Sequence, residues 1–222
     1  MSIKRDVLAT GEIYHIFNKS VGNETIFSSL RHLTQIINSG DFYRYQQSMR
    51  YSKFKQMTIE LRDSYLSGVK DHPPLVEIYS FAFMPNHYHL LVKQLQDDGI
   101  KIFASNIQNS FAKYFNTKND RNGSLFQSPF KSRWIGTDED FMHVSRYIHL
   151  NPVTAYMIGI GDLEKYPFTS YMRYVKNTDQ NFINTKFLLS LFGGSKKRYR
   201  EFINDGVDYQ RELARIKSLV LE

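Results

Sequence analysis

Two histidines separated by one residue, His87 and His89, stand inside the apolar run 87–93. If this run is a strand, its side chains alternate between the two faces of the sheet, so both imidazoles project from the same face. Neutral imidazole is among the commonest metal ligands in proteins. The spacing therefore predicts that the two histidines bind one metal ion together, which requires at least one further ligand from another part of the chain.

A second motif supplies a candidate ligand and a candidate nucleophile. Tyr147 and Asn151 are four residues apart, so on a helix they project from one face, and His143 extends that stripe by one turn. Two imidazoles and one amide oxygen leave coordination positions open. Such a donor set suits Mg²⁺ or Mn²⁺ and argues against a closed structural zinc site. The expected metal ligands are therefore His87, His89 and Asn151.

These residue types together point to phosphoryl transfer. The cation would neutralise and orient a scissile phosphate, and Tyr147 would attack phosphorus, giving a phosphotyrosine and a free hydroxyl. A tyrosine hydroxyl is protonated at neutral pH, so the step needs help in removing that proton. The covalent link retains the phosphodiester energy, so rejoining needs no ATP. The absence of a glycine-rich phosphate loop agrees with this interpretation.

The composition favours a nucleic-acid partner. The chain has 222 residues, a formal net charge of +7 and 15% aromatic residues. Basic charge attracts polyanions, and aromatic faces stack on unpaired bases. Cysteine is absent, which excludes disulfides and thiolate metal sites. With no signal-like N-terminus and no apolar run of membrane-spanning length, we expect a soluble cytoplasmic protein without a membrane partner.

The hydrophobic pattern predicts an α+β fold. Its first six elements, in the order β-α-β-β-α-β, are typical of a ferredoxin-like antiparallel sheet with helices on one face. The expected elements are strand 11–17, a helix from Ser28 or Ser29 to Gly40, strands 75–82 and 87–93, helix 100–116, an extended stretch 125–135, and a helix from Thr137 to about Leu150 that Asn151-Pro152 would end.

Two parts of the chain lie outside this pattern. The stretch 42–70 is polar, basic and tyrosine-rich, and it is expected to be partly helical. A polar linker follows Tyr174, so we predict a catalytic domain over residues 1–174. A basic C-terminal extension over residues 175–222 is expected to be helical, including a helix from Tyr209 to Leu221.

Four stretches resemble one known family, the REP-associated tyrosine transposases of the single-tyrosine HUH superfamily. They are Tyr14-His-Ile-Phe-Asn-Lys19, Phe83-Met-Pro-Asn-His-Tyr-His-Leu-Leu91, Arg121-Asn-Gly-Ser-Leu-Phe-Gln127 and Tyr147-Ile-His-Leu-Asn-Pro-Val153, with a weaker fifth at Tyr166-Pro-Phe-Thr-Ser-Tyr171. Together they span most of the chain. The His-x-His and Tyr-Ile blocks, in this order, are the most specific.

The resemblance implies an HUH fold that cuts single-stranded DNA, often at hairpin-bearing repeats. It places the nucleophile at Tyr147, joined to the 5′-phosphate side of the break, and the metal ligands at His87, His89 and Asn151. Tyr114 is the competing nucleophile and ranks second, because its i+4 neighbour Lys118 cannot ligate a metal while protonated.

The chain departs from the family pattern at Ser128-Pro129-Phe130, where many relatives have Gly-Arg-Tyr or Gly-Arg-Phe. Other cations are therefore expected to contact the DNA backbone. The candidates near the site are Arg121, Lys131 and Arg133, and a second basic group comprises Lys196, Lys197, Arg198 and Arg200. Trp134 and Tyr199 are candidates for stacking on bases.

Two functions remain open on these grounds. One is a metal-dependent single-strand DNA transposase or endonuclease; the other is a non-catalytic, domesticated protein that binds hairpin nucleic acid on the same fold. Single-stranded or hairpin DNA is the expected partner of both. A homodimer is possible, and Tyr147 would then act either in its own subunit or in a partner's.

Overall fold

The computed structural model describes residues 7–176 and 182–212. Its elements are β1 (Ile13–Lys19), the short 3₁₀ helix η1 (Val21–Asn23), α1 (Leu30–Tyr43), α2 (Tyr51–Phe54), α3 (Ile59–Lys70), β2 (Val76–Met84), β3 (His87–Gln94), α4 (Gly99–Lys118), β4 (Lys131–Ile135), α5 (Asp138–Thr154), η2 (Ile160–Lys165), α6 (Tyr171–Val175), α7 (Lys186–Ser190) and α8 (Lys196–Asp205).

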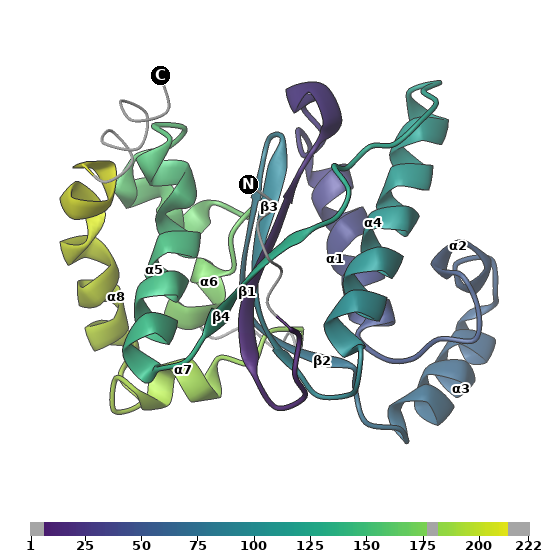
Figure 1. The fold of residues 1–222 in the computed structure, drawn as a ribbon, viewed down its shortest axis with the longest axis horizontal. Coiled ribbons are helices and arrows are strands. Elements are labelled where there is room, and N and C mark those ends of the chain that lie inside the picture. Colours follow the sequence, from purple (N-terminus) through teal and green to yellow (C-terminus); the bar gives the residue numbers. More distant parts are fainter. Residues whose placement is uncertain (1–6, 177–181, 213–222) are drawn as a thin grey trace.

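The four strands form one antiparallel sheet in the order β2-β3-β1-β4. Helices α1 and α4 both lie on one face of it (Figure 1). Strand order and connectivity are those of the ferredoxin-like arrangement, so the fold expected from the sequence is confirmed. The central strands β1 and β3 are rich in apolar residues because both of their faces are buried.

The opposite face of the sheet is covered as well. Helix α5 packs there, with α6 and α7 beside it and α8 on its outer side (Figure 1). Phe141 and Ile148 on α5 are almost fully buried, and the Phe141 ring stands edge-on to that of Tyr79 on β2 at 5.0 Å. These residues belong to the apolar stripe of α5, which packs on the sheet. The sheet therefore has helices on both faces, where the sequence had suggested one, because β2 and β3 present apolar side chains in both directions.

Two helices run further than expected. Helix α1 begins after Ser29, whose side chain accepts the backbone N–H of His32, but it passes Gly40 and ends at Tyr43. Helix α5 begins after Thr137 as expected, yet it continues through Pro152 to Thr154. Proline removes one helical hydrogen bond. Burial of Pro152 and Val153 holds the last turn in place despite that loss.

The stretch expected to be extended over 125–135 is mostly irregular. Only Lys131–Ile135 forms a strand, β4, which pairs with β1 at the edge of the sheet. Phe126 makes an isolated bridge with Ser20. Pro129 lies in the irregular part, where its lack of an N–H costs no ladder hydrogen bond.

The polar stretch 42–70 forms α2 and α3 beside α1 and α4 (Figure 1). Its own aromatic cluster holds it together: the ring of Phe42 lies 4.8 Å from that of Phe54 and 5.4 Å from that of Tyr51. Tyr65 on α3 packs against Phe54 at 5.9 Å. Part of the stretch is therefore helical, as expected, and it is anchored to the end of α1.

The C-terminal part packs against the rest of the fold. Tyr199 on α8 is fully buried and bonds to side chains of α5. The helix expected over 209–221 lies mostly outside the described residues, although residues 207–212 are helical. The division at residue 174 stays a prediction.

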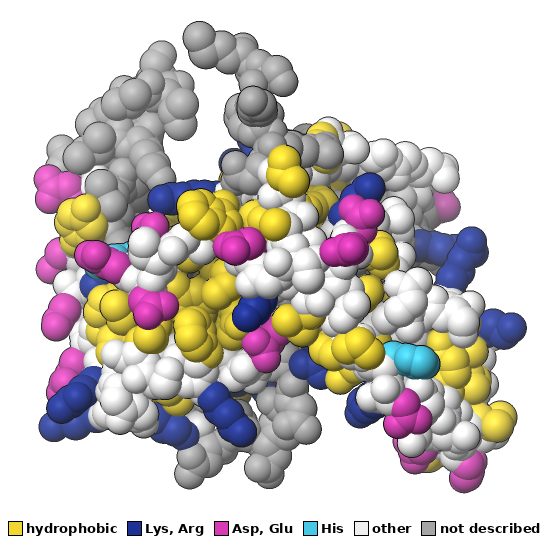
Figure 2. All heavy atoms as spheres, turned by 60° about the horizontal axis from the view of Figure 1, so that its bottom comes forward, with side chains coloured by type: hydrophobic (Ala, Val, Ile, Leu, Met, Phe, Trp, Pro, Cys, Tyr) yellow, Lys and Arg dark blue, Asp and Glu magenta, His cyan; other side chains and the backbone are white. Residues whose placement is uncertain are grey.

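Two surface properties bear on partners. Within the described ranges, no helix is both long and apolar enough to cross a membrane. Figure 2 shows that lysine and arginine side chains on the face it draws are scattered among acidic ones. On that face the positive charge does not form a single continuous patch.

Candidate active site

The two histidines of the His-x-His motif lie side by side on β3. His87 pairs with Lys19 and His89 with Phe17 on the neighbouring strand β1. Their ring centroids are 5.1 Å apart, with the ring planes nearly perpendicular. The alternation of strand side chains predicted this shared face, which is the face covered by α5.

A third histidine joins them, and the sequence analysis did not single it out. His15 on β1 is buried, and its Nε2 lies 2.8 Å from Nδ1 of His89. The two rings stack at 5.0 Å. The available signal was strand parity: His15 and Phe17 share a face of β1, and the register places Phe17 opposite His89. His15 contacts His89 only because β1 pairs with β3 in this register.

Asn86 determines which nitrogen of His87 carries the proton. Its side-chain oxygen lies 2.7 Å from Nδ1 of His87, while its amide nitrogen faces the side-chain oxygen of Asn23 at 3.5 Å. An amide oxygen only accepts hydrogen bonds, so Nδ1 of His87 must donate. The lone pair of His87 is therefore on Nε2. Asn86, which the sequence analysis placed only in a turn, positions a ligand.

The same argument applies to His89. Its Nδ1 is engaged with His15, whereas its Nε2 is buried with no hydrogen-bond partner among the described residues. A buried polar atom without a partner costs about 1–3 kcal/mol. If Nδ1 donates to His15, the unpartnered Nε2 bears a lone pair. A ligand histidine whose other nitrogen donates to a neighbouring group is the usual arrangement in metal sites.

Burial keeps these imidazoles neutral. Desolvation, together with the charge of Lys19, lowers the pKa of His87 to about 4. The pKa of His89 lies well below its ordinary value, first through burial and then through His15, His87 and Lys19. Burial, aided by Arg133, lowers the pKa of His15 to about 3. All three are therefore neutral near pH 7, the state in which imidazole ligates a metal.

Tyr147 comes to this cluster from α5. Its ring meets that of His89 edge-on at 5.5 Å and that of His15 at 5.9 Å. Its exposed fraction is 37%, so the side chain remains accessible. The buried stripe of α5 fixes the helix on the sheet and thereby aims the tyrosine at the histidines of its own chain.

Asn151 lies one turn further along α5 and is half-buried. Its amide nitrogen donates to the backbone oxygen of Tyr147 at 3.4 Å. The helix thus brings the tyrosine and the asparagine to one face, as the four-residue spacing predicts.

The donor set fits a divalent cation in part. Nε2 of His87 offers a lone pair, Nε2 of His89 offers one when its Nδ1 donates to His15, and Asn151 would add the amide oxygen. Across residues 7–176 and 182–212, no group of three or more His, Cys, Asp or Glu side chains is arranged to hold a metal. A site here therefore depends on the amide, on water or on substrate oxygens for its remaining positions.

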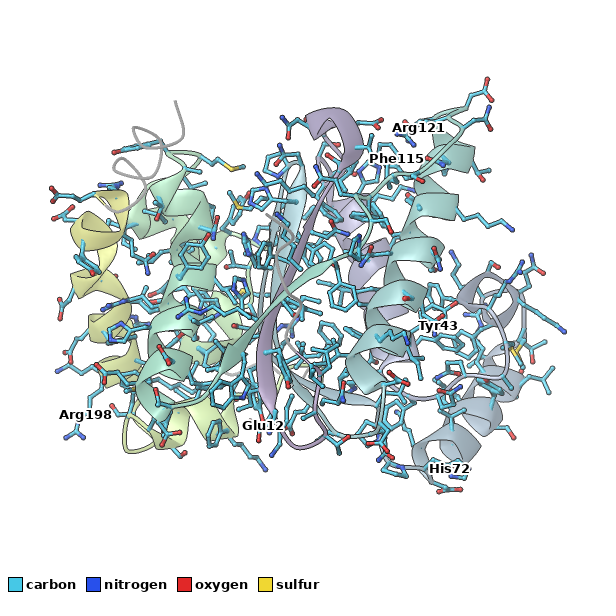
Figure 3. All side chains as sticks on the ribbon, viewed as in Figure 1. Glu12, Tyr43, His72, Phe115, Arg121 and Arg198 are labelled. Carbon is cyan, nitrogen blue, oxygen red and sulfur yellow. The ribbon has the colours of Figure 1, made fainter. Side chains whose placement is uncertain are left out.

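The candidate DNA contacts divide by location. Lys131 and Arg133 are exposed on β4, and by register they share the sheet face of Phe17 and His15. Arg121 lies instead in the loop after α4, and Figure 3 places it beyond the end of that helix. There it forms an ion pair with Glu24 at 2.7 Å.

The second basic group lies on α8, which α5 separates from the sheet (Figure 1). Arg200 pairs with Glu164 at 2.8 Å, and Lys197 lies 3.9 Å from Glu201. Lys196 donates to the backbone oxygen of Lys176, while Arg198 points outward in Figure 3. The structure does not bring this group to the histidines.

The two aromatic candidates for base stacking also differ. Trp134 is 53% exposed on the edge strand, and its indole N–H donates to the carboxylate of Glu12 at 2.6 Å. Tyr199 is fully buried, so it cannot stack on a base, and that expectation is wrong. Its spacing on α8 reflects packing against α5 and α6.

Two comparisons with known proteins gave a match. Residues 46–151 match the family described as IS200-like transposases. A solved structure of a REP-associated tyrosine transposase bound to a REP hairpin superimposes with a TM-score of 0.51 at 18% identity, covering 83% of this chain and 98% of the other. At that identity the likeness shows a shared fold. The search of curated proteins gave no match.

The part matched to the IS200-like transposases includes His87, His89, Tyr147 and Asn151. It also includes Tyr114, the competing nucleophile. Tyr114 lies on α4, where its ring packs against Phe111 at 6.0 Å and against His32 on α1. Helix α4 covers the sheet face of Tyr88, which is opposite that of the flanking histidines. His15 precedes the matched residues, so its place in the cluster comes from the structure.

Proposed function

We propose that this protein is a metal-dependent, single-strand DNA transposase or endonuclease that cleaves and rejoins DNA at hairpin-bearing sites through a 5′-phosphotyrosine on Tyr147. The family match supports the transposase class. The similar solved structure is of a transposase bound to a REP hairpin, which supports a hairpin DNA partner here.

One observation carries the proposal. Tyr147, from a helix that begins 44 residues after the end of β3, places its ring 5.5 Å from that of His89, whose Nε2 is buried without a hydrogen-bond partner among the described residues. A packing role would explain a buried tyrosine and hydrogen-bonded histidines. It does not explain an exposed tyrosine beside an unsatisfied imidazole.

Each residue of the proposed active site has a separate role. A divalent cation, Mg²⁺ or Mn²⁺, when held by His87, His89 and Asn151, would neutralise the scissile phosphate and orient it. His15 and Asn86 engage the Nδ1 atoms of His89 and His87, which leaves the two Nε2 atoms for the cation. Lys131 and Arg133 lie beside the cluster and would contact the strand backbone.

In the covalent step, the Tyr147 oxygen forms a bond to phosphorus as the bond from phosphorus to the 3′-oxygen breaks. The tyrosine hydroxyl loses its proton, and the departing 3′-oxygen takes one up. The products are a 5′-phosphotyrosine and a free 3′-hydroxyl. Attack of a 3′-hydroxyl on the phosphotyrosine reverses the step and rejoins the DNA without ATP.

The test is adduct formation on labelled single-stranded DNA that carries a hairpin, with Mg²⁺ or Mn²⁺ present. We expect a covalent protein–DNA adduct from the wild-type chain and none from Tyr147→Phe. Tyr114→Phe is the matched control, since it removes the same hydroxyl from a tyrosine on the other side of the sheet, and it should retain the adduct.

Two outcomes would contradict the proposal. An adduct that survives in Tyr147→Phe and disappears in Tyr114→Phe moves the nucleophile to α4. Tight hairpin binding without an adduct, with either metal, favours the non-catalytic binding protein instead.

The contact of Tyr147 with histidines of its own chain supports action within one subunit. Mixing Tyr147→Phe with His89→Ala tests this point. Each variant then lacks one half of the site, and no adduct should form. Recovery of adduct in the mixture would show that two subunits exchange the tyrosine.

A further inference from the structure

A polar pocket of about 660 Å³ lies between α4 and the segment formed by the end of α1 and α2. Helix α4 covers the sheet face of Tyr88, opposite that of the site histidines. Figure 3 shows Tyr43, which lines the pocket, between α4 and α2. The volume is in the range of ordinary ligand sites. The sheet separates this pocket from the proposed active site.

The lining of the pocket is strongly basic. Arg50, Lys55, Lys113 and Lys118 contribute to it, and no aspartate or glutamate does. In the described part of the chain, no acidic side chain forms an ion pair with any of the four. Lys55 donates to the side-chain oxygen of Gln35 at 3.1 Å and lies 5.1 Å from the centroid of the Tyr51 ring, so neither contact supplies a carboxylate. Four such cations around one pocket attract an anion.

From Asn106 to Lys118, the face of α4 that borders the pocket is polar. Asn106, Asn109, Lys113 and Thr117 recur at three to four residues, the spacing of one helix face. A helix face directed at a neighbouring element is usually apolar, as the buried stripe of α4 is. Packing against α2 therefore does not account for these residues, whereas a polar ligand between the two elements does.

Tyr114 provides an independent indication. Its hydroxyl is shielded from solvent and has no hydrogen-bond partner within the described residues. It lines the same pocket as Lys113 and Lys118. A phosphate oxygen would accept from this hydroxyl and meet the lysines at the same time.

We infer that this pocket binds phosphate groups of a nucleic-acid strand, as a second contact on the side of the protein away from Tyr147. The inference rests on the proposed function for the identity of the strand. It assigns a role to the basic, tyrosine-rich stretch 42–70, because α2 supplies one wall of the pocket.

The experiment measures the salt dependence of hairpin DNA binding in a Tyr147→Phe background, where no cleavage occurs. The DNA carries single-stranded flanks on both sides of the hairpin. Lys113→Gln with Lys118→Gln should weaken binding several-fold. It should also reduce the slope of log affinity against log salt by about 1.4, the value for two lost contacts to single-stranded phosphates.

The matched control is Lys70→Gln with Lys101→Gln, which removes the same charge from α3 and α4 outside the pocket. It should change the slope by much less. Equal slopes in the two double variants would overturn the inference. Acetylation of lysines, read by mass spectrometry, gives a second measurement, and bound DNA should protect Lys113 and Lys118 but not Lys101.

Tyr114→Phe changes no charge and should weaken strand binding about two- to five-fold, the size of one hydrogen bond. A mononucleotide that binds with the same dependence on Lys113 and Lys118, while the strand does not, would overturn the inference in favour of a free nucleotide. Adduct formation by the wild type is measured separately. If the wild type forms the adduct but the pocket variants bind DNA as the wild type does, this inference alone is refuted. If the pocket variants weaken binding but no adduct forms, only the proposed chemistry is refuted.

Discussion

Two buried histidines on the same face of the sheet differ in one respect. Burial lowers the pKa of His149 on α5 to about 3, and burial also lowers the pKa of His89 on β3. His149 has a partner on each nitrogen, with the hydroxyl of Tyr199 at 2.6 Å and that of Ser170 at 2.7 Å. Within residues 7–176 and 182–212, His89 has a partner on one nitrogen only. Burial and a lowered pKa are common to both, so the unsatisfied nitrogen is what marks a site.

Each hydrogen bond in the network around His149 can be given one donor and one acceptor. The backbone N–H of Phe81 donates to the Ser170 oxygen, so His149 Nε2–H and that N–H can both point at this oxygen. Tyr199 then donates to Nδ1 of His149, and the hydroxyl of Ser145, 2.9 Å away, donates to Tyr199. The chain of bonds joins β2, α5 and α8. A satisfied buried network of this kind fixes structure.

The largest effect should come from His149→Ala. It removes a fully buried side chain, leaves a cavity, and strips two buried hydroxyls of a partner. We expect a loss of about 4 kcal/mol in the free energy of unfolding, measured by urea titration. Any residual folded protein should still bind Mn²⁺. Loss of Mn²⁺ binding at unchanged stability would make His149 a functional residue and remove the contrast.

His89→Ala should give the opposite pattern. It removes an unsatisfied nitrogen and deprives only His15 of a partner, so its stability loss should be clearly smaller than that of His149→Ala. Adduct formation should fall at least about 100-fold, since losing a metal ligand costs no less than losing its supporting partner. Thermal shift with and without Mn²⁺ checks the metal. A variant that keeps its Mn²⁺ shift would show that His89 is not a ligand.

Acid should destabilise the folded protein through buried His149. The pKa of His149 is lowered in the folded state to about 3, while an unfolded histidine titrates near 6.5. Below pH 6.5 the unfolded state therefore binds a proton that the folded state does not, and stability falls with falling pH. His149 alone should cost about 1.5 kcal/mol between pH 6.5 and 5.0. Urea titrations at both values should show a smaller difference in His149→Ala; an unchanged difference would mean that His149 is charged when folded.

Much of the site was predictable because the relevant rules are local. Strand alternation put His87 and His89 on one face, and helical spacing put Tyr147 with Asn151. These rules need only the chain itself. The burial of Phe141 and Ile148 then fixed which side of α5 meets the sheet.

What escaped prediction depends on pairing between distant elements. His15 enters the cluster only because β1 pairs with β3 in one particular register. Tyr199 is a candidate for base stacking on sequence grounds because no residue near it in the sequence predicts its contact with α5. The same holds for the extra turn of α5 after Asn151, where burial of Pro152 outweighs the helix-ending tendency of proline.

The smallest effect tests the comparison most finely. Tyr199→Phe removes one hydroxyl while keeping the buried ring, and it leaves Nδ1 of His149 without a donor. The expected stability loss is about 1 kcal/mol, with adduct formation unchanged within about two-fold. Tyr156→Phe is the matched control, because that residue is 76% exposed and should leave stability unchanged. If Tyr199→Phe instead lowers adduct formation at full stability, the network holds Tyr147 in position, and the satisfied histidine contributes to function through the helix that both residues share.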